Sequence, residues 1–195
     1  MKLVDHRPRG RRRDPALDDL ILDHTLAMFA NGGYESVSIE GVAARAGVGK
    51  ATIYRRYPTK AALIVAAVRE RLCLVDQLPD TGDLRADLVT MMSPLVRRLL
   101  SPDGPMLIAF MAERFREPEL EAEFERSVVG RKRVHMRKLL RDAVERGDLA
   151  PDTDIEISAE MLPALIWYRA LNHLPFEADF AEVVVDQLLE VRAPL

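Results

Sequence analysis

The segment VGKATIYRRYPTK, residues 48–60, combines cationic side chains and tyrosines with very little apolar surface. Lysine and arginine donate hydrogen bonds to phosphates and base edges, and a tyrosine hydroxyl can reach a phosphate oxygen. The Gly49-Lys50 pair is also a part of many nucleotide-binding loops. The segment therefore indicates either a nucleic-acid contact or a nucleotide site, and its flanks separate the two.

The nucleotide interpretation fails on its spacing. A phosphate-binding loop needs the pattern G-x-x-x-x-G-K-[ST], entered from a strand. Here Ala44 stands at the first glycine position and Ala51 follows Lys50, while the preceding residues have a helical pattern. Three requirements are missing, so we exclude a phosphate-binding loop of this type.

A short helix over residues 49–56 would have one narrow apolar stripe. At about 100° per residue, Ile53 and Tyr57 share a face and pack inward. The remaining residues face outward or lie on a flank, and we take them as candidates for DNA contact: Lys50, Ala51, Thr52, Tyr54, Arg55 and Arg56. A helix with so little apolar surface is explained if its outer side meets a ligand.

A second helix precedes this one at the distance of a helix-turn-helix, about residues 38–57. Ser38 is a predicted N-cap, and Ile39 and Val42 begin an apolar face. Gly47 supplies the left-handed residue that ends the helix. Two short helices joined by such a turn place the second helix in the major groove of DNA.

The outward residues suit that task. Arg55 can donate two hydrogen bonds to O6 and N7 of guanine, and Ala51 or the methyl group of Thr52 can meet a thymine methyl. The candidates for phosphate contacts are Lys50, Tyr54, Lys60 and the backbone amides after Ser38.

The rest of the chain also has helical periodicity. A first helix begins at Asp14-Pro15 and ends at Asn31-Gly32-Gly33, and Thr59 caps a fourth helix whose apolar residues extend to Leu74 and Val75. A turn-rich break follows at residues 79–83. Further helices are predicted over residues 84–100, 105–116, 118–146, 155–173 and 177–191. We expect an all-α fold of about nine helices.

Charge is unevenly distributed along the 195 residues. Residues 1–78 contain 13 Lys and Arg against 9 Asp and Glu, whereas residues 79–195 contain 15 against 22. A basic N-terminal part indicates that any polyanion binds there. Residues 1–13 are Arg-rich and lack apolar periodicity, so we expect a disordered basic arm, either contacting DNA or only solubilising the chain.

Several classes of protein are disfavoured. Cys73 is the only cysteine and reads as a buried structural thiol. The N-terminus is too polar for a signal peptide and no apolar run could span a membrane, so we expect a cytoplasmic protein without a membrane partner. The four histidines are scattered without metal-ligand spacing, and no catalytic grouping stands out. We expect no metal, no cofactor and no enzyme activity.

The residues discussed above resemble the TetR family of bacterial transcriptional regulators. The matching runs are ILDHTLAMFANGGY, residues 21–34, and SVSIEGVAARAGVGKATIYRRYPTKAAL, residues 36–63, and the resemblance covers about residues 15–66. His24 and Thr25 stand where small residues are usual, and Gly49 replaces a commoner serine. The first departure, at His24 and Thr25, concerns packing. The second, at Gly49, concerns one helix cap or one hydrogen bond to a phosphate.

The resemblance implies a homodimer that binds a palindromic double-stranded DNA operator. It implies a DNA-binding domain over residues 14–60 and a domain for effector binding and dimerisation over residues 61–195. In family terms Ser38, Tyr54 and Lys60 look like contacts to the DNA backbone. The positions that look base-proximal are Lys50, Ala51, Thr52 and Arg55.

The C-terminal half carries weaker signals. Apolar side chains suited to an adaptable pocket are Met92, Met106, Phe110, Met111 and Trp167, with Met91, Met136, Met161 and Phe115 as further candidates. A ligand at the joint around Pro118 could tilt the fourth helix. The last two helices carry more apolar surface than an isolated pair should expose, and the resemblance implies a four-helix dimer interface there. The candidates are Met161, Leu165, Tyr168, Phe180, Val184, Leu188 and Val191.

These observations favour a regulator that a small apolar effector releases from its operator. Two alternatives stay open. The same architecture could serve an activator or a co-repressor-dependent regulator, and a helical enzyme or small-molecule-binding module could lack DNA binding altogether.

Overall fold

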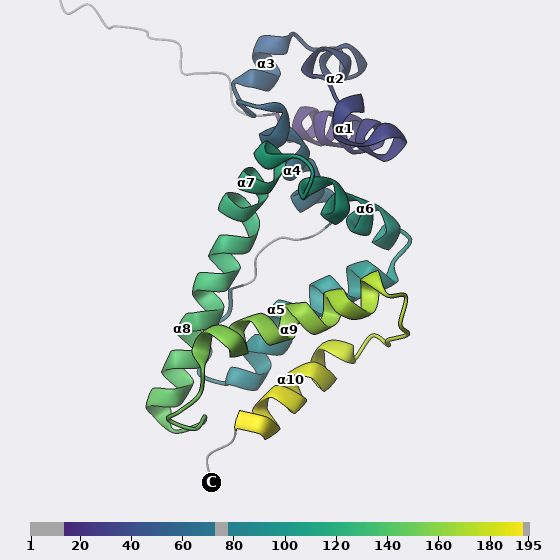
Figure 1. Ribbon diagram of the computed structural model, residues 1–195. Coiled ribbons are helices and arrows are strands. Elements are labelled where there is room, and N and C mark those ends of the chain that lie inside the picture. The colour runs from purple at the N-terminus through teal and green to yellow at the C-terminus, as the bar shows by residue number, and fades with distance from the viewer. Residues whose placement is uncertain (1–13, 73–77, 193–195) are drawn as a thin grey trace, which may run out of the picture.

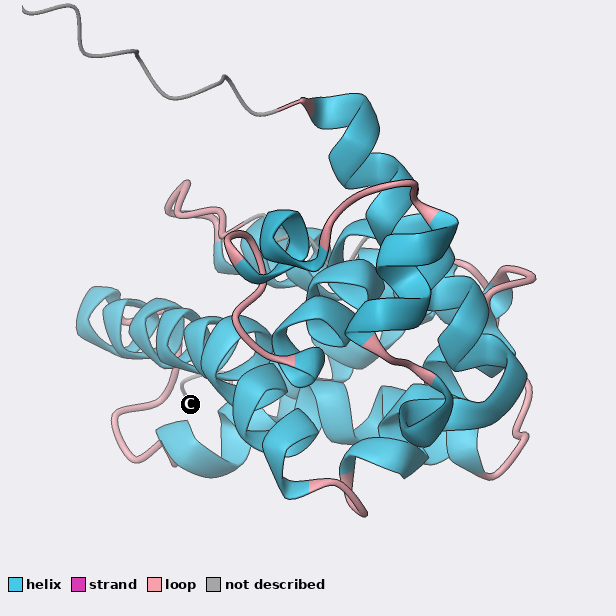
Figure 2. Ribbon diagram, turned by 90° about the horizontal axis from the view of Figure 1, so that it is seen from above, coloured by secondary structure: helices cyan, strands magenta, loops and turns pink. Residues whose placement is uncertain are grey.

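The computed structural model describes residues 14–72 and 78–192, which contain only helices and loops (Figures 1 and 2). The head consists of α1 (Pro15–Ser36), α2 (Ile39–Arg45) and α3 (Lys50–Tyr54), and α4 (Lys60–Arg71) follows it. The predicted all-α fold is confirmed. The basic arm of residues 1–13 and the positions Cys73, Leu74 and Val75 lie outside the described residues.

The C-terminal part is built from longer helices. They are α5 (Leu84–Leu100), α6 (Gly104–Arg114), α7 (Pro118–Phe124), the π-helical turn η1 (Glu125–Val129), α8 (Gly130–Arg146), α9 (Ile155–Leu171) and α10 (Phe180–Arg192). Since α7, η1 and α8 follow without a break, they form the single rod predicted over residues 118–146 (Figure 1). Counted in this way, the described residues form nine helices. The last helix begins three residues later than predicted, because residues 177–179 form a turn whose Glu177 carbonyl accepts a hydrogen bond from the Phe180 amide.

Side-chain caps fix the starts of the short helices. The Ser38 hydroxyl accepts a hydrogen bond from the Gly41 amide, and the Thr59 hydroxyl accepts one from the Ala62 amide, each at 3.0 Å. Such caps satisfy amides that have no partner inside the helix, which stabilises it by about 1 kcal/mol. Both predicted caps are confirmed.

The first helix is kinked where its end was predicted. Gly33 has a φ of +66°, a left-handed conformation that costs glycine little, and Gly32 is also non-helical. The chain turns there, and the residues after the kink are directed toward α6. A Cβ atom on Gly33 would lie only 2.9 Å from a carboxylate oxygen of Glu113 on α6.

Two hydrophobic cores lie along the molecule. The first joins α1–α4 to α6 and α7, and a chain of aromatic rings runs through it, with Phe29 and Phe124 each packed on Phe110 at 5.9 and 5.0 Å between ring centroids. The second is formed by α5, α8, α9 and α10. Because the buried residues of α4, such as Leu63 and Ile64, belong to the first core, α4 packs as part of the head. The division of the chain at residue 60 stays a prediction.

Two further properties concern only residues 14–72 and 78–192. None of the helices there is both long enough and apolar enough to cross a membrane. Within the same ranges, no cluster of His, Cys, Asp and Glu side chains has the arrangement of a metal site.

Candidate nucleic-acid interface and internal cavity

A single buried side chain anchors α3 to the head. Ile53 is fully buried, and behind it α2 buries Ile39 and Val42. Between the two helices Gly47 has a φ of +65°, and the Val48 amide donates to the Ala43 carbonyl at 2.9 Å. The arrangement is the helix-turn-helix that the sequence predicts.

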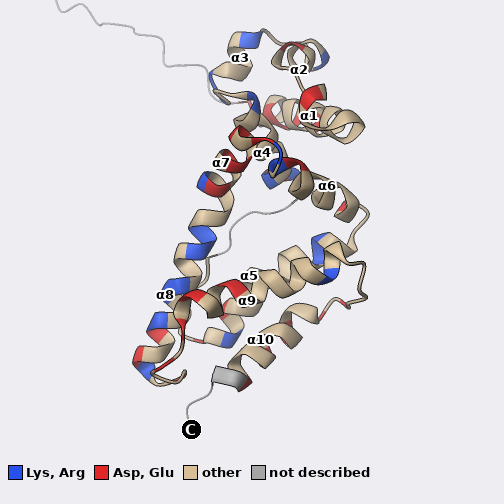
Figure 3. Cartoon of the chain, viewed as in Figure 1, with Lys and Arg blue, Asp and Glu red and all other residues tan. Residues whose placement is uncertain are grey.

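The outer side of α3 is open to solvent. Lys50, Ala51, Tyr54 and Arg55 are exposed, and Thr52 is half-buried. Figures 1 and 3 show α3 at the outer end of the molecule, far from α5, α9 and α10, with basic residues on and beside it. The side chain of Arg55 has no hydrogen bond or ion pair with any residue in the described parts of the chain. Its guanidinium is therefore available to an external acceptor.

Two lysines flank this surface with weakly held carboxylate partners. Lys50 Nζ lies 2.9 Å from a carboxylate oxygen of Glu40 on α2, and both side chains are exposed. Lys60 Nζ lies 3.8 Å from Glu35 and 3.7 Å above the ring centroid of Tyr34. The exposed pair of Lys50 and Glu40 contributes little to stability, so Lys50 can exchange its partner for a phosphate at small cost. Lys60 is partly buried, but its long pair with the exposed Glu35 is weak as well.

Arg56 is placed differently from its neighbours. Its guanidinium forms an ion pair with Asp18 on α1, its Nη1 donates to the Thr52 carbonyl at 3.2 Å, and only 9% of its side chain is exposed. Sequence geometry places Arg56 on the outward arc, but the end of α3 turns it against the first helix. Its contacts fasten α3 to α1 and leave the outer surface to the other residues.

Tyr34 connects the head to the joint between α6 and α7. Its amide donates to Glu113 on α6 at 3.1 Å, and its hydroxyl donates to Glu119 on α7 at 3.3 Å. Burial of the phenol and the nearby Glu119 carboxylate raise the pKa of Tyr34 to about 12. We call Tyr34, Glu113 and Glu119 the Tyr34 clasp. Since Lys60 lies on the ring of Tyr34, the clasp joins a candidate phosphate contact to the C-terminal helices.

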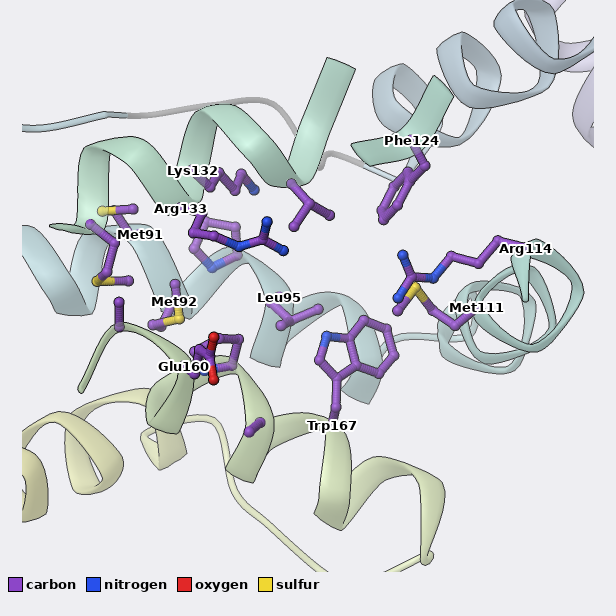
Figure 4. A pocket seen from close by; sticks show the side chains of 16 residues that line it. Met91, Met92, Leu95, Met111, Arg114, Phe124, Lys132, Arg133, Glu160 and Trp167 are labelled. Carbon is purple, nitrogen blue, oxygen red and sulfur yellow. The ribbon is translucent and has the colours of Figure 1, made fainter. Parts of the chain in front are cut away.

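A cavity of about 360 Å³ lies between α5, α8, α9 and the joint of α6 and α7 (Figure 4). Its wall is mainly apolar and includes Met91, Leu95 and Phe124. Four charged side chains also line it: Arg114, Lys132, Arg133 and Glu160. A mainly apolar cavity with a few polar groups is typical of a small-molecule site.

Some of the predicted pocket residues meet in this cavity. Met92, Met111 and Trp167 line it. Phe110 does not, because it is fully buried between Phe29 and Phe124 in the first core. Met106 lies beside a separate hollow near Asn31. Four charged residues of the wall are not predicted from the sequence, because charged residues at helical spacing usually face solvent: Arg114, Lys132, Arg133 and Glu160.

The apolar residues of the last two helices fall into two groups. Met161, Leu165 and Tyr168 of α9 are exposed, with 59% of Tyr168 accessible. Phe180, Val184 and Leu188 of α10 are buried within the subunit's own second core, where they pack against α5 and α9. Val184 and Leu188 nevertheless form the floor of a groove beside Leu165. The side chain of Val191 lies outside the described residues. We call the exposed residues with this groove the α9–α10 face.

Two family models match the chain. Residues 21–67 match the bacterial regulatory proteins of the tetR family, and residues 78–188 match the tetracyclin repressor-like C-terminal domain. The chain belongs to the TetR family of transcriptional regulators. The first match begins within α1 and ends within α4, so it includes the helix-turn-helix, while the second runs from just before α5 into α10.

Relatives within the TetR family extend along most of the chain. An HTH-type regulator of Bacillus subtilis (strain 168) is 30% identical over 163 residues, which are 84% of this chain and 82% of the relative. A DNA-binding transcriptional repressor of Mycobacteroides abscessus is 31% identical over 185 residues, 94% and 95% of the two chains. A TetR-family regulator of known crystal structure, 26% identical, superimposes with a TM-score of 0.63 and covers 91% of this chain and 99% of its own. The family is one of DNA-binding regulators, not of enzymes.

Proposed function

We propose that this TetR-family chain is a repressor whose binding to operator DNA is released by a small molecule. The outward side of α3 is the observation that carries the proposal. Ile53 is the one fully buried side chain of α3, whereas Ala51, Tyr54 and Arg55 are exposed and the Arg55 side chain has no partner among the described residues. The second helix of a helix-turn-helix enters the major groove in this orientation.

The contacts to DNA follow from side-chain chemistry. Arg55 would read guanine through two hydrogen bonds, and Ala51 or Thr52 would meet a thymine methyl. The proposed phosphate contacts are Lys50, Tyr54, Lys60 and the amides at the start of α2 after Ser38. Because Arg56 is paired with Asp18, we assign it to the positioning of α3 and not to DNA contact.

A second copy of the chain would bind through the α9–α10 face. Met161, Leu165 and Tyr168 form one exposed apolar stripe on α9, and a groove lies beside them. Pairing this face with itself about a two-fold axis would bury the stripe in a four-helix interface. Two heads spaced about 34–36 Å apart would then enter successive major grooves of a palindromic operator.

The cavity offers a physical route for release. Arg114 and Phe124, on the two sides of the α6–α7 joint, both line it, and the Tyr34 clasp links this joint to the head. A ligand that binds more tightly to one arrangement of the joint shifts the population toward that arrangement. If the favoured arrangement has a different spacing of the two heads, operator affinity falls by the same coupling free energy.

The test uses the full-length protein and a labelled DNA fragment from its own promoter region. Fluorescence anisotropy at low salt should show binding, and Arg55→Ala should weaken it about tenfold or more, since a bidentate contact to a base contributes about 1–3 kcal/mol. Arg85→Ala is the matched control, because Arg85 on α5 pairs with Asp186 on α10, and these two helices lie far from α3 (Figure 1).

The outcomes separate the alternatives. Failure of the unaltered protein to bind this DNA at low salt would refute DNA regulation at its own promoter. A small molecule that lowers the affinity for DNA would support a repressor released by its effector. A small molecule that raises this affinity would instead identify the chain as a co-repressor-dependent regulator.

A further inference from the structure

The polar groups of the cavity specify the chemistry of its ligand, an inference that rests on the proposed effector role of this cavity. Three of the four charged residues that line it are cations, namely Arg114, Lys132 and Arg133, and Glu160 is the one carboxylate. The wall therefore offers many hydrogen-bond donors and few acceptors. A ligand that satisfies it must carry acceptors.

Arg114 is the best placed of these donors. Its guanidinium points into the cavity beside Met111 (Figure 4). One terminal nitrogen donates to Glu121 at 2.9 Å, but its buried Nε–H has no acceptor in the described part of the chain. That Nε–H has no accessible surface, but the second terminal nitrogen has no hydrogen bond in the described part of the chain and is free to donate to an acceptor on the ligand.

The other arginine and the tryptophan extend the same pattern. Arg133 points toward the cavity from α8, and it is paired with Glu125 at 2.6 Å. Neither Glu121 nor Glu125 lines the cavity, and both are partly exposed, so water weakens the two ion pairs. The indole N–H of Trp167 has no acceptor among the described residues, and its ring borders the cavity.

The remaining wall is suited to an apolar body. Met91, Met92 and Met111 provide flexible, polarisable thioethers, and Leu95 and Trp167 provide broad apolar surfaces. The volume of about 360 Å³ lies near the lower end for small-molecule sites. It suits an alkyl chain or a small ring system.

We propose that the effector is an amphipathic organic anion, whose carboxylate-type group binds Arg114 and whose apolar body packs against the methionines and Trp167. Binding of the anion would compete with Glu121 for the Arg114 guanidinium. Arg114 lies on α6 and Glu121 on α7, so this competition alters the contact that ties the two helices at their joint.

The test is a titration of the full-length protein without DNA, followed by tryptophan fluorescence. Trp167 is the only tryptophan of the chain and lines the cavity, so its emission reports occupancy directly. The probes are decanoate, decanol and decyltrimethylammonium, which share an alkyl chain and differ in charge. Decanoate should bind most tightly, and decyltrimethylammonium most weakly.

Variants assign the charge preference to Arg114. Arg114→Gln should weaken decanoate binding about tenfold or more and leave decanol binding unchanged, because only the charge-assisted hydrogen bonds are lost. Arg85→Gln, on the outside of α5, is the matched control and should change neither. Glu160→Gln should not weaken decanoate binding. Thermal unfolding of each variant checks that it is folded.

Three results would overturn the inference: tighter binding of the cation than of the anion, equal decanoate affinity in Arg114→Gln and the unaltered protein, or no fluorescence response to any of the probes. None of these results depends on DNA. Failure of the chain to bind its promoter would therefore count against the proposed regulation while leaving the ligand chemistry to be judged separately.

Discussion

Lys50 illustrates how the side chains proposed to contact DNA are held in the free protein. Its hydrogen bond with Glu40 raises the pKa of Lys50 and lowers the pKa of Glu40, so both groups stay charged at neutral pH. The pair spans from α2 to α3 across the turn, and both side chains are exposed. Glu40 thus keeps Lys50 oriented along the outer surface, but it also places a negative charge close to the proposed phosphates.

Replacing Glu40 by Gln should strengthen DNA binding severalfold at low salt. The substitution removes one charge that repels phosphate and frees Lys50 from its partner, and both effects favour the complex. Anisotropy titrations over a salt series measure the change, which should shrink as the salt concentration rises. Glu145→Gln, at an exposed position of α8, is the control of equal charge and should leave DNA affinity unchanged; a weaker complex with Glu40→Gln would contradict the placement of Lys50.

Lys60 should behave as a phosphate contact without sequence preference. Its Nζ is held over Tyr34 and near Glu35, so it is positioned but not neutralised by a close partner. Lys60→Ala should weaken binding to different DNA sequences by similar factors and reduce the slope of log affinity against log salt by about one. If the slope is unchanged, Lys60 does not contact a phosphate.

The end of α1 depends on a glycine for two reasons. Gly33 has a positive φ, and its Cα lies so close to Glu113 that a side chain would meet the carboxylate. Gly33→Ala should lower the free energy of unfolding by about 1–2 kcal/mol from the backbone conformation alone, and further through the damaged clasp. Urea unfolding measures the loss.

Gly82 provides the matched control for that substitution. It also has a positive φ, but nothing lies within 4 Å of its Cβ position. Gly82→Ala should show only the backbone cost. Equal losses in the two variants would show that the approach of Glu113 to the kink contributes nothing.

The Tyr34 clasp should also give a pH dependence. The pKa of Tyr34 is raised from 10.0 to about 12 in the folded chain. Below pH 10 the phenol is neutral in both states and the contribution of the clasp is complete. Between about pH 10 and pH 12 the unfolded chain loses this proton and the folded chain keeps it, so the free energy of unfolding falls as pH rises.

Tyr34→Phe isolates this effect, because it removes the titrating hydroxyl and keeps the aromatic ring. The difference in unfolding free energy between the unaltered chain and Tyr34→Phe should be constant below pH 10 and decrease above it. Urea unfolding at several alkaline pH values measures the difference. A constant difference over the whole range would mean that neither burial nor Glu119 raises the pKa of the phenol.

Local chemistry determined which elements could be predicted. Ser38, Thr59 and Gly47 act through neighbours a few residues away, so their caps and turn were readable from spacing. The inward positions of Arg56 and Phe110 could not be predicted, because they depend on contacts with residues far along the chain. Arg56 pairs with Asp18, and Phe110 packs between Phe29 and Phe124. The charged lining of the cavity was also missed, because α6, α8 and α9 must pack together before those side chains share a space.

The whole molecule couples its two cores through shared residues. Leu95 and Leu99 of α5 pack against both the first core and the second, and Leu95 also lines the cavity. A ligand in the cavity therefore contacts a residue that belongs to both cores. A ligand that extends beyond the existing cavity must displace the surrounding helices, since the rest of the interior has little free volume. A shift of these helices changes operator affinity only if it alters the spacing of two heads held in one dimer. The dimer is therefore central to the proposed function.

Leu165→Glu should separate the two copies. Leu165 lies on the exposed stripe of α9, with 41% of its surface accessible in the single chain, so a carboxylate there costs the monomer little. In the proposed interface it would be buried against apolar groups without a partner, which is strongly unfavourable. Sedimentation velocity should show a monomer, and operator affinity should fall about a hundredfold or more because the second head no longer binds at high effective concentration.

Val134→Glu is the control, because Val134 is an apolar residue of α8 that is 65% exposed and lies outside the α9–α10 face. It should leave both the oligomeric state and operator binding unchanged. Trp167 fluorescence with decanoate should show that the Leu165→Glu chain keeps its cavity, which separates loss of the dimer from loss of the fold. If the Leu165→Glu protein remains dimeric, the interface lies elsewhere on the surface. If it is monomeric but binds the operator with unchanged affinity, operator binding does not require a dimer.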